Sequence, residues 1–113
     1  MSTDCLFCKI ATRDIPAEIL YEDEEMLAFR DIAPQAPVHF LVVPKKHIQG
    51  PAEVGTEDEG LIGRMMRTAS KVAKENGIID FRLVFNNGAE AGQTVFHIHM
   101  HVLGGRALSW PPG

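Results

Sequence analysis

The fold is decided by residues 92–105, which read GQTVFHIHMHVLGG. Within this stretch His97, His99 and His101 alternate with single apolar residues. Side chains at i, i+2 and i+4 of a strand share one face. The alternation therefore predicts a strand with three imidazoles on one side and apolar residues packed into a core on the other. Such a row of imidazoles supplies neutral nucleophiles, proton donors and metal ligands near neutral pH.

Two other interpretations of the histidine row are open at this point. A single histidine in an alternating strand is usually exposed or simply hydrogen-bonded. Three in strict alternation, preceded by Gly-Gln-Thr and followed by Gly-Gly, favour a functional site instead. A metal-binding cluster is the more specific alternative, because His-x-His pairs chelate zinc.

Length and composition limit the class of protein. The 113 residues predict one domain spanning 1–113, with a real hydrophobic core. A net charge of −4 argues against general nucleic-acid binding through phosphate neutralisation. The sequence shows neither a signal-peptide pattern at its start nor an apolar stretch long enough to cross a membrane, so a cytoplasmic protein is expected.

The two cysteines form the pair Cys5-Leu6-Phe7-Cys8 near the N-terminus. A Cys-x-x-Cys pair is redox-active, half of a zinc site, or a pair of buried thiols. The redox interpretation requires a preceding strand, which a pair this close to the N-terminus lacks. Spacing alone leaves zinc binding and simple burial equally open.

Two helices are predicted from capping residues and apolar spacing. A short helix is expected to start at Asp4, as its N-cap, and to run to about Thr12. A long helix is expected to start at the capping box of Thr56 and Glu59 and to end at Gly77, a plausible C′ residue. Its apolar stripe consists of Leu61, Ile62, Met65, Met66, Ala69, Val72 and Ala73.

Strands account for most of the remaining apolar segments. They are expected at residues 17–21, 26–29, 38–43 and 81–85, followed by the histidine strand. The order β-β-β-α-β-β after a short helix predicts an α+β fold with a mainly antiparallel sheet.

In its histidine segment and several other motifs, the chain resembles the histidine-triad (HIT) family. The segment 97–103 matches the family's alternating signature His-φ-His-φ-His-φ-φ, where φ is apolar. Further matches are DIAPQAP at 31–37, PKKH at 44–47, GGR at 104–106 and WPPG at 110–113. The resemblance covers nearly the whole chain from Leu6 onward. Within the family, the chain is most similar to the nucleotide-binding branch.

The resemblance implies a fold and an activity. The expected fold is a five-stranded sheet with one long and one short helix, which joins a second copy into a larger continuous sheet as a homodimer, with a C-terminal tail at about 104–113. The expected partners are purine nucleoside monophosphates and phosphoramidates. The expected reaction is hydrolysis of the P–N bond through a nucleotidyl-histidine, with no cofactor required for catalysis.

The same resemblance implies roles for individual residues. His99 is the expected nucleophile, and His101 assists the departing amine. Thr94, where the family usually has serine, offers a hydroxyl to the phosphate, and His39 supports the catalytic pair from behind. The expected nucleotide-binding residues are Phe7, Ile10, Phe29, Asp31, Ile32, Leu41, Asn86, Gly92, Gln93, Thr94, Val95, His99 and His101.

Two further features follow from the family comparison. Many bacterial-type relatives join the Cys-x-x-Cys pair to two histidines in a closed structural zinc site, and here the matching residues are Cys5, Cys8, His47 and His97. Trp110 is expected to reach the partner's cleft and to influence specificity.

Other functions remain open on sequence grounds. A second branch of the family hydrolyses dinucleoside polyphosphates. A protein of this kind could also act as a nucleotide-binding scaffold or regulatory protein that retains its catalytic residues, and zinc binding itself could be the purpose.

Overall fold

A computed structural model describes residues 4–113 of the chain. The elements are α1 (Leu6–Ala11), β1 (Ile19–Glu22), β2 (Met26–Arg30), β3 (Val38–Pro44), α2 (Glu59–Glu75), β4 (Phe81–Phe85) and β5 (Met100–Gly104), with short 3₁₀ turns at Pro51–Glu53, Thr56–Asp58 and Ala89–Ala91. The predicted order of strands and helices is confirmed.

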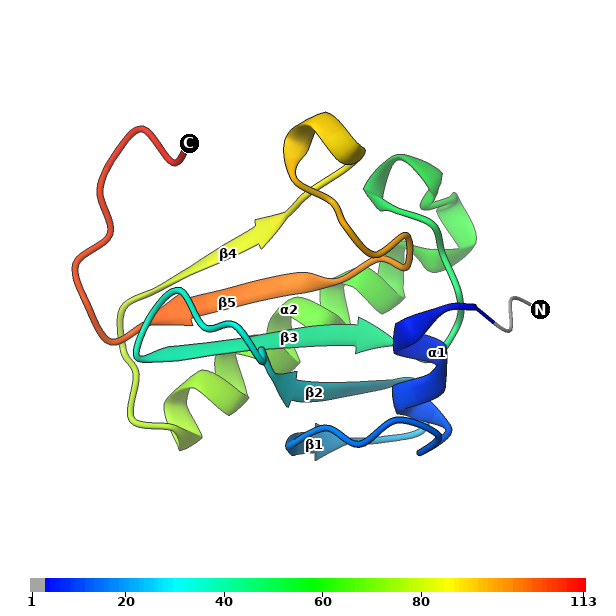
Figure 1. The fold of residues 1–113 in the computed structure, drawn as a ribbon, viewed down its shortest axis with the longest axis horizontal. Coiled ribbons are helices and arrows are strands. Elements are labelled where there is room, and N and C mark those ends of the chain that lie inside the picture. Colours follow the sequence, from blue (N-terminus) through cyan, green and yellow to red (C-terminus); the bar gives the residue numbers. More distant parts are fainter. Residues whose placement is uncertain (1–3) are drawn as a thin grey trace.

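The five strands form one antiparallel sheet in the order β1-β2-β3-β5-β4. The long helix α2 covers one face of this sheet, whereas the short helix α1 lies at one end of the opposite face (Figure 1). The expected α+β fold is therefore confirmed. Because β5 lies between β3 and β4, the C-terminal histidine segment is placed in the middle of the sheet, next to the apolar strand β3.

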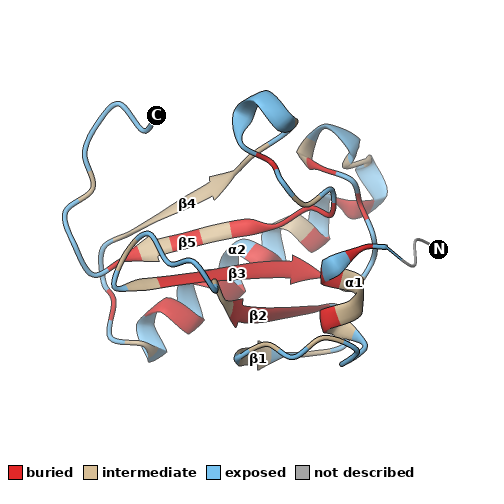
Figure 2. Ribbon diagram, viewed as in Figure 1, coloured by how far each residue is buried: buried red, intermediate tan, exposed pale blue. Residues whose placement is uncertain are grey.

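Apolar side chains on the two faces of the sheet form two separate cores. Alternate residues of β2, β3 and β5, which are the most buried strands (Figure 2), point to α2 or to α1. The α2 side contains Phe40, Val42, Met100 and Val102, packed against the helix. The α1 side is smaller and contains Phe7, Ile10, Leu27, Phe29, Leu41 and Val43. His39 and His101 lie on the α1 side by parity.

The histidine segment is not a strand along its whole length, so the predicted strand is too long. Strand β5 starts at Met100, and its register against β3 pairs Val42 with Met100. Continuing that register would place Pro44 opposite Ile98. Proline has no N–H to donate, so the ladder ends there. Ile98 instead donates its N–H to the carbonyl of Ile48 at 2.6 Å.

The predicted helix caps are wrong at both N-termini. The cap of α1 is Cys5, whose sulfur accepts from the backbone N–H of Cys8 at 3.3 Å, and not Asp4. The predicted capping box of α2 does not form, because Thr56 starts a separate 3₁₀ turn and the helix begins at Glu59. Gly77, in contrast, follows the C-cap with φ of 78°, as its predicted C′ role requires.

One member of the predicted apolar stripe of α2 does not reach the core. Met66 is 52% exposed, and Thr68 takes a buried position beside the other stripe residues. No helix within residues 4–113 is long and apolar enough to cross a membrane.

Candidate active site and metal centre

A pocket of about 290 Å³ lies between α1 and the sheet, on the face opposite α2. Its lining includes ten of the thirteen residues that the sequence assigned to nucleotide binding: Phe7, Ile10, Phe29, Asp31, Ile32, Leu41, Thr94, Val95, His99 and His101. The walls are mainly apolar, with a few polar side chains among them, including Asp31, Thr94, His99 and His101. This distribution is typical of small-molecule sites, in which a few polar groups orient a ligand that is otherwise held by apolar contacts.

The ring of His99 has a defined tautomer. Its Nδ1 lies 2.8 Å from the backbone carbonyl of His97. A carbonyl only accepts, so Nδ1 carries the hydrogen and Nε2 keeps a lone pair. The ring of Phe7 packs edge-on against His99, with 4.9 Å between centroids, and holds the imidazole in place.

His101 lies next to His99, with 5.0 Å between the ring centroids. Behind it, His39 Nε2 is 2.9 Å from His101 Nδ1, and Asp31 Oδ2 is 3.4 Å from the same Nε2 atom. The strand register explains this arrangement, because His101 pairs with Leu41, two residues from His39 on the same face of β3. His39 is thus a buried histidine with partners, and it contacts the catalytic candidate directly.

Both histidines of the pocket are neutral at pH 7. Burial lowers the pKa of His101 to about 4, and the neighbouring rings of His99 and His39 act in the same direction. Burial also lowers the pKa of His99, against the opposing effect of its hydrogen bond to the His97 carbonyl. A neutral His99 is required of a nucleophile, because an imidazolium has no lone pair.

A second cluster contains Cys5, Cys8, His47 and His97, whose potential ligand atoms all lie within 4.8 Å of one another. The Nδ1 atom of His97 is 3.2 Å from Cys5 Sγ, 3.5 Å from Cys8 Sγ and 3.1 Å from His47 Nδ1. Tetrahedral zinc with ordinary Zn–S and Zn–N bonds places its S and N ligands about 3.5 Å apart. The sequence prediction that these four residues come together is confirmed, and their spacing fits a zinc ion.

The tautomer of His97 also suits a metal ligand. Its Nε2 lies 2.7 Å from the backbone carbonyl of Pro44, so Nε2 donates a hydrogen bond and Nδ1 keeps a lone pair that faces the two sulfurs. The backbone carbonyl of the same residue accepts from His99. His97 therefore belongs to both clusters, with its ring in the metal centre and its main chain behind the nucleophile.

Three predicted nucleotide-binding residues do not line the pocket. The side chain of Gln93 is buried: it accepts from Gly88 N, and it donates to Val95 O in its own loop and to Gln49 O in the segment after β3. Its backbone N–H donates to the Gly88 carbonyl at 3.1 Å, so in this structure it points to its own loop and not to the pocket. Asn86 and Gly92 lie against each other, outside the pocket wall.

Some pocket residues escaped the sequence prediction. Leu6, Ile15, Pro16, Ala17 and Arg30 also line the cavity. Ile15, Pro16 and Ala17 belong to the irregular segment between α1 and β1, where no periodic pattern marks a binding residue. Trp110, the predicted specificity residue, is 81% exposed in the projecting tail.

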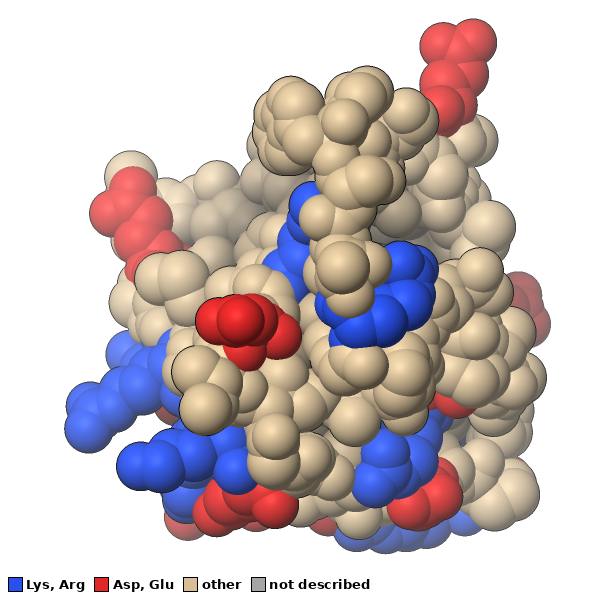
Figure 3. Space-filling view, turned by 90° about the vertical axis from the view of Figure 1, so that its left-hand side faces the viewer, with Lys and Arg blue, Asp and Glu red and all other residues tan. Residues whose placement is uncertain are grey.

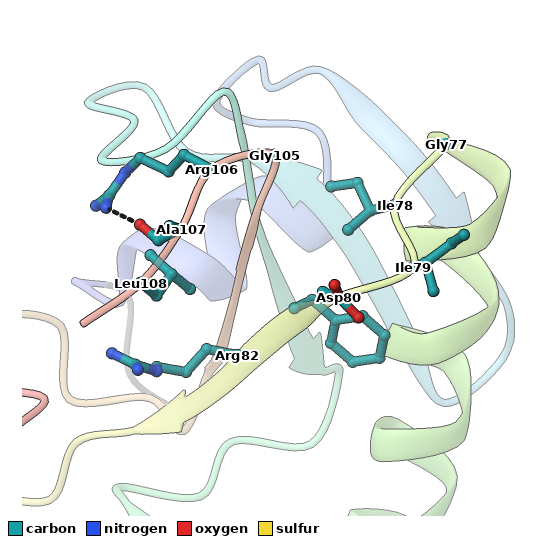
Figure 4. Close-up of a pocket in the computed structure, with 10 residues that line it drawn as sticks. Gly77, Ile78, Ile79, Asp80, Arg82, Gly105, Arg106, Ala107 and Leu108 are labelled. Atoms are coloured by element: carbon teal, nitrogen blue, oxygen red, sulfur yellow. Dashed lines mark hydrogen bonds between the residues drawn. The ribbon is translucent and has the colours of Figure 1, made fainter. Parts of the chain in front are cut away.

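A larger cavity, about 760 Å³, lies at the other end of the sheet, beneath the C-terminal tail. Figure 4 shows its walls: Ile78 and Ile79 after α2, Arg82 on β4, and Arg106 to Leu108 after β5. Lysine and arginine side chains gather at this end, at the base of the tail (Figure 3). The lining of this cavity contains no histidine or cysteine, whereas His99 and His101 line the smaller pocket.

Comparison with known proteins gives consistent matches over the whole chain. The model of the family described as "Scavenger mRNA decapping enzyme C-term binding" matches residues 4–109. An uncharacterised HIT-like protein of Synechocystis is 55% identical over 114 residues, covering all of both chains. A HIT family hydrolase from Legionella pneumophila shares 50% identity and a TM-score of 0.94, covering 97% of this chain and 100% of that one. A histidine triad protein from Clostridium difficile shares 40% identity and a TM-score of 0.92, covering 96% of both chains.

Proposed function

The chain belongs to the histidine-triad family, and from that premise we propose that it hydrolyses the P–N bond of purine nucleoside phosphoramidates. One observation carries the proposal. The Nδ1–H of His99 is fixed on the His97 carbonyl, and its Nε2 lone pair is left for the pocket that this ring lines. A buried, neutral and oriented imidazole of this kind suits nucleophilic attack on phosphorus.

The pocket supplies complementary contacts for each part of a nucleotide. Its apolar walls, including Phe7 and Phe29, suit a flat purine ring. Asp31 suits the ribose hydroxyls, because it lines the pocket and its carboxylate is oriented by the Ala33 N–H, which donates to Oδ1 at 2.8 Å. The Thr94 hydroxyl and the backbone N–H groups of Thr94 and Val95 are assigned to the phosphate.

The reaction proceeds in two displacements. In the first, the Nε2 lone pair of His99 forms a bond to phosphorus while the P–N bond breaks toward nitrogen, which accepts a hydrogen bond from His101 Nε2–H and takes one proton from solvent. The amine leaves neutral, and the nucleotidyl-imidazolium of His99 carries the compensating positive charge. In the second, water attacks phosphorus and gives up a proton to solvent, and the His99–P bond breaks to release the nucleoside monophosphate and the neutral imidazole.

Hydrolysis of adenosine 5′-phosphoramidate tests this assignment against the polyphosphate alternative. We expect a kcat/KM for the phosphoramidate at least about 100-fold above that for diadenosine tetraphosphate, a difference of roughly 3 kcal/mol in activation free energy. The reverse preference would favour the dinucleoside polyphosphate hydrolase. Tight AMP binding with no turnover of either substrate would favour a nucleotide-binding scaffold.

Replacing Asp31 with asparagine is expected to weaken binding of AMP by about 10- to 100-fold. Hydrogen bonds to a charged acceptor contribute about 1.5–3 kcal/mol, and the amide offers the ribose hydroxyls only a neutral acceptor. Titration calorimetry with AMP and with its 2′,3′-dideoxy analogue measures the effect. Wild type should distinguish the two ligands and the variant should not. Equal losses for both ligands would remove Asp31 from the ribose site.

We propose that the four-residue cluster holds a structural zinc ion. Two cysteines and two histidines form a closed tetrahedral set with no open position for substrate, so the ion would supply rigidity and no catalytic step. Cys5 and Cys8 would tie the start of α1 to His47, which follows β3, and to His97, which precedes β5. Since α1 also carries Phe7 and Ile10, the same ion would hold one wall of the nucleotide pocket.

A homodimer is proposed from the surface along β4. This strand lies at the edge of the sheet, all five of its residues are partly buried, and its outer backbone edge is available for pairing with another strand. Beside it, Ile62 of α2 and Phe85 of β4 line one apolar groove, and Met66 is exposed one turn further along the helix. An isologous contact through β4 would extend the sheet across two copies.

Met66→Glu tests this surface. The side chain is exposed, so the monomer fold should tolerate the charge, whereas a two-fold interface would bring two carboxylates together. We expect wild type to sediment as a dimer and the variant to shift toward the monomer by at least about 10-fold in dissociation constant. Lys71→Glu is the matched control, because Lys71 lies on the other side of α2, over the ring of Tyr21. A monomeric wild type would refute the proposed interface.

A further inference from the structure

A chain of hydrogen bonds runs behind His101 and ends on a backbone amide. Gln35 N donates to His39 Nδ1 at 3.0 Å, and His39 Nε2 lies 2.9 Å from His101 Nδ1. The loop that supplies this amide precedes β3, and its side chains are largely exposed. Of the three hydrogen-bonded residues, His39 lies in β3 and His101 in β5, and Gln35 lies in the loop outside the sheet.

The amide gives the chain of bonds a single direction. A backbone N–H can only donate, so His39 Nδ1 must accept and the hydrogen of His39 must sit on Nε2. His39 Nε2–H then donates to His101 Nδ1, which must be unprotonated, so the hydrogen of His101 sits on its own Nε2. The Asp31 carboxylate near His39 Nε2 agrees with this assignment, because it too can only accept.

The position of the Gln35 amide is fixed from the far end of β5. Arg106 donates from both Nη2, at 2.9 Å, and Nε, at 3.2 Å, to the carbonyl oxygen of Gln35. Its third bond, from Nη1, goes to the carbonyl of Ala107 at 3.0 Å and is visible in Figure 4. Among the described residues no carboxylate lies within ion-pair distance of Arg106, so backbone carbonyls are its partners.

A close backbone contact supports the same arrangement. Gly105 has φ of 94°, and a Cβ at this position would stand 2.9 Å from Cβ of Pro37. The absence of a side chain lets the turn after β5 pack directly on the loop that carries Gln35. Two separate contacts thus hold that loop against the end of the histidine strand.

We propose that the Gln35 backbone N–H, held in place by Arg106, is a positioning group that fixes the tautomer of His101 through His39. The inference rests on the proposed function, because it explains how His101 presents a hydrogen on Nε2 to the departing amine. Without the amide, His39 is free to carry its hydrogen on Nδ1, and His101 then loses the donor that holds Nδ1 unprotonated. The simpler alternative is that these bonds only stabilise the loop.

Nitrogen NMR of the imidazole rings tests the tautomers directly, with no substrate present. Long-range ¹H–¹⁵N spectra distinguish protonated from unprotonated ring nitrogens, and His39→Asn and His101→Asn spectra assign the signals. At pH 7 we expect wild-type His39 and His101 both to be protonated on Nε2 only. Finding either ring protonated on Nδ1 would overturn the inference while leaving the proposed P–N hydrolysis untouched.

Two substitutions at Gln35 separate the amide from the side chain. Gln35→Pro removes the N–H, whereas Gln35→Ala keeps it and removes only the side-chain bond to the Ala33 carbonyl. We expect Gln35→Pro to lower kcat about 100-fold, within the usual contribution of a positioned proton donor, with KM nearly unchanged and with mixed tautomers in the NMR spectrum. Gln35→Ala should resemble wild type in both measurements. Wild-type tautomers and kcat in a folded Gln35→Pro protein would contradict the inference.

Arg106 provides a second test that leaves residue 35 intact, and it decides the matter if the proline variant does not fold. Arg106→Ala should lower kcat about 10-fold and populate the second tautomer of His39. Arg106→Lys keeps a donor for the Gln35 carbonyl, so it should retain most of the wild-type kcat and the wild-type tautomer of His39. A loss of thermal stability in Arg106→Ala, with kcat and tautomers unchanged, would establish the purely structural role. If no variant, wild type included, turned over phosphoramidates, the proposed function would fail, but the NMR result would stand.

Discussion

His99→Ala is expected to lower kcat for adenosine 5′-phosphoramidate by about 10⁴-fold or more. The substitution removes the atom that bonds to phosphorus. In other enzymes, removal of the nucleophile lowers kcat by a similar or larger factor. Steady-state assays with a sensitive AMP or amine readout measure the loss. The variant should still bind AMP, because the apolar walls of the pocket and Asp31 are intact.

Controls make this result specific to the nucleophile. His101→Ala should lower kcat by only about 10²- to 10³-fold, because water can still protonate a good leaving group. Circular dichroism and metal content should match wild type in both variants. A His99→Ala protein with more than about one tenth of wild-type activity would remove His99 as the nucleophile.

Loss of the metal centre is expected to lower both the thermal stability of the protein and its affinity for AMP. The double variant Cys5→Ser/Cys8→Ser should lose bound zinc and unfold at a midpoint more than about 10 °C lower. Binding of AMP should also weaken by about 10-fold, because α1 carries three residues of the pocket wall and would lose its attachment to His47 and His97. Calorimetric melting, metal analysis and AMP titration give the three readouts.

Thr12→Ala provides the matched control, because it changes the exposed C-terminal end of the same helix without touching the cluster. It should keep about one zinc per chain and the wild-type midpoint. A chelator should lower the midpoint of wild type and leave that of the double variant unchanged. If the chelator changed neither protein and no zinc were found, the cluster would be a set of buried thiols and imidazoles.

The sequence predicts the elements well where the pattern is local. The apolar spacing of α2 and the run of apolar residues in β3 define their elements without help from the rest of the chain. The final strand is mispredicted because its partner decides its length. Pro44, more than fifty residues earlier, ends the ladder opposite Ile98, and no property of the histidine segment itself shows this.

The site is predicted in the same uneven way. Residue types and their spacing identify the histidines, the cysteines and Asp31, and the fold brings them into a pocket and a cluster. Backbone contributions are missed, because a carbonyl such as that of His97 or an amide such as that of Gln35 leaves no mark in the sequence. The sequence also does not show that the side chain and N–H of Gln93 are occupied by hydrogen bonds to Gly88, Gln49 and Val95.

The stereochemical course at phosphorus tests the central claim most directly. The substrate is an adenosine 5′-phosphoramidate made chiral at phosphorus by sulfur and hydrolysed in ¹⁸O-labelled water. Each in-line displacement inverts phosphorus, so attack by His99 followed by attack by water predicts net retention. Net inversion would show that water attacks the substrate directly, and it would contradict the nucleotidyl-histidine intermediate and the role proposed for His99.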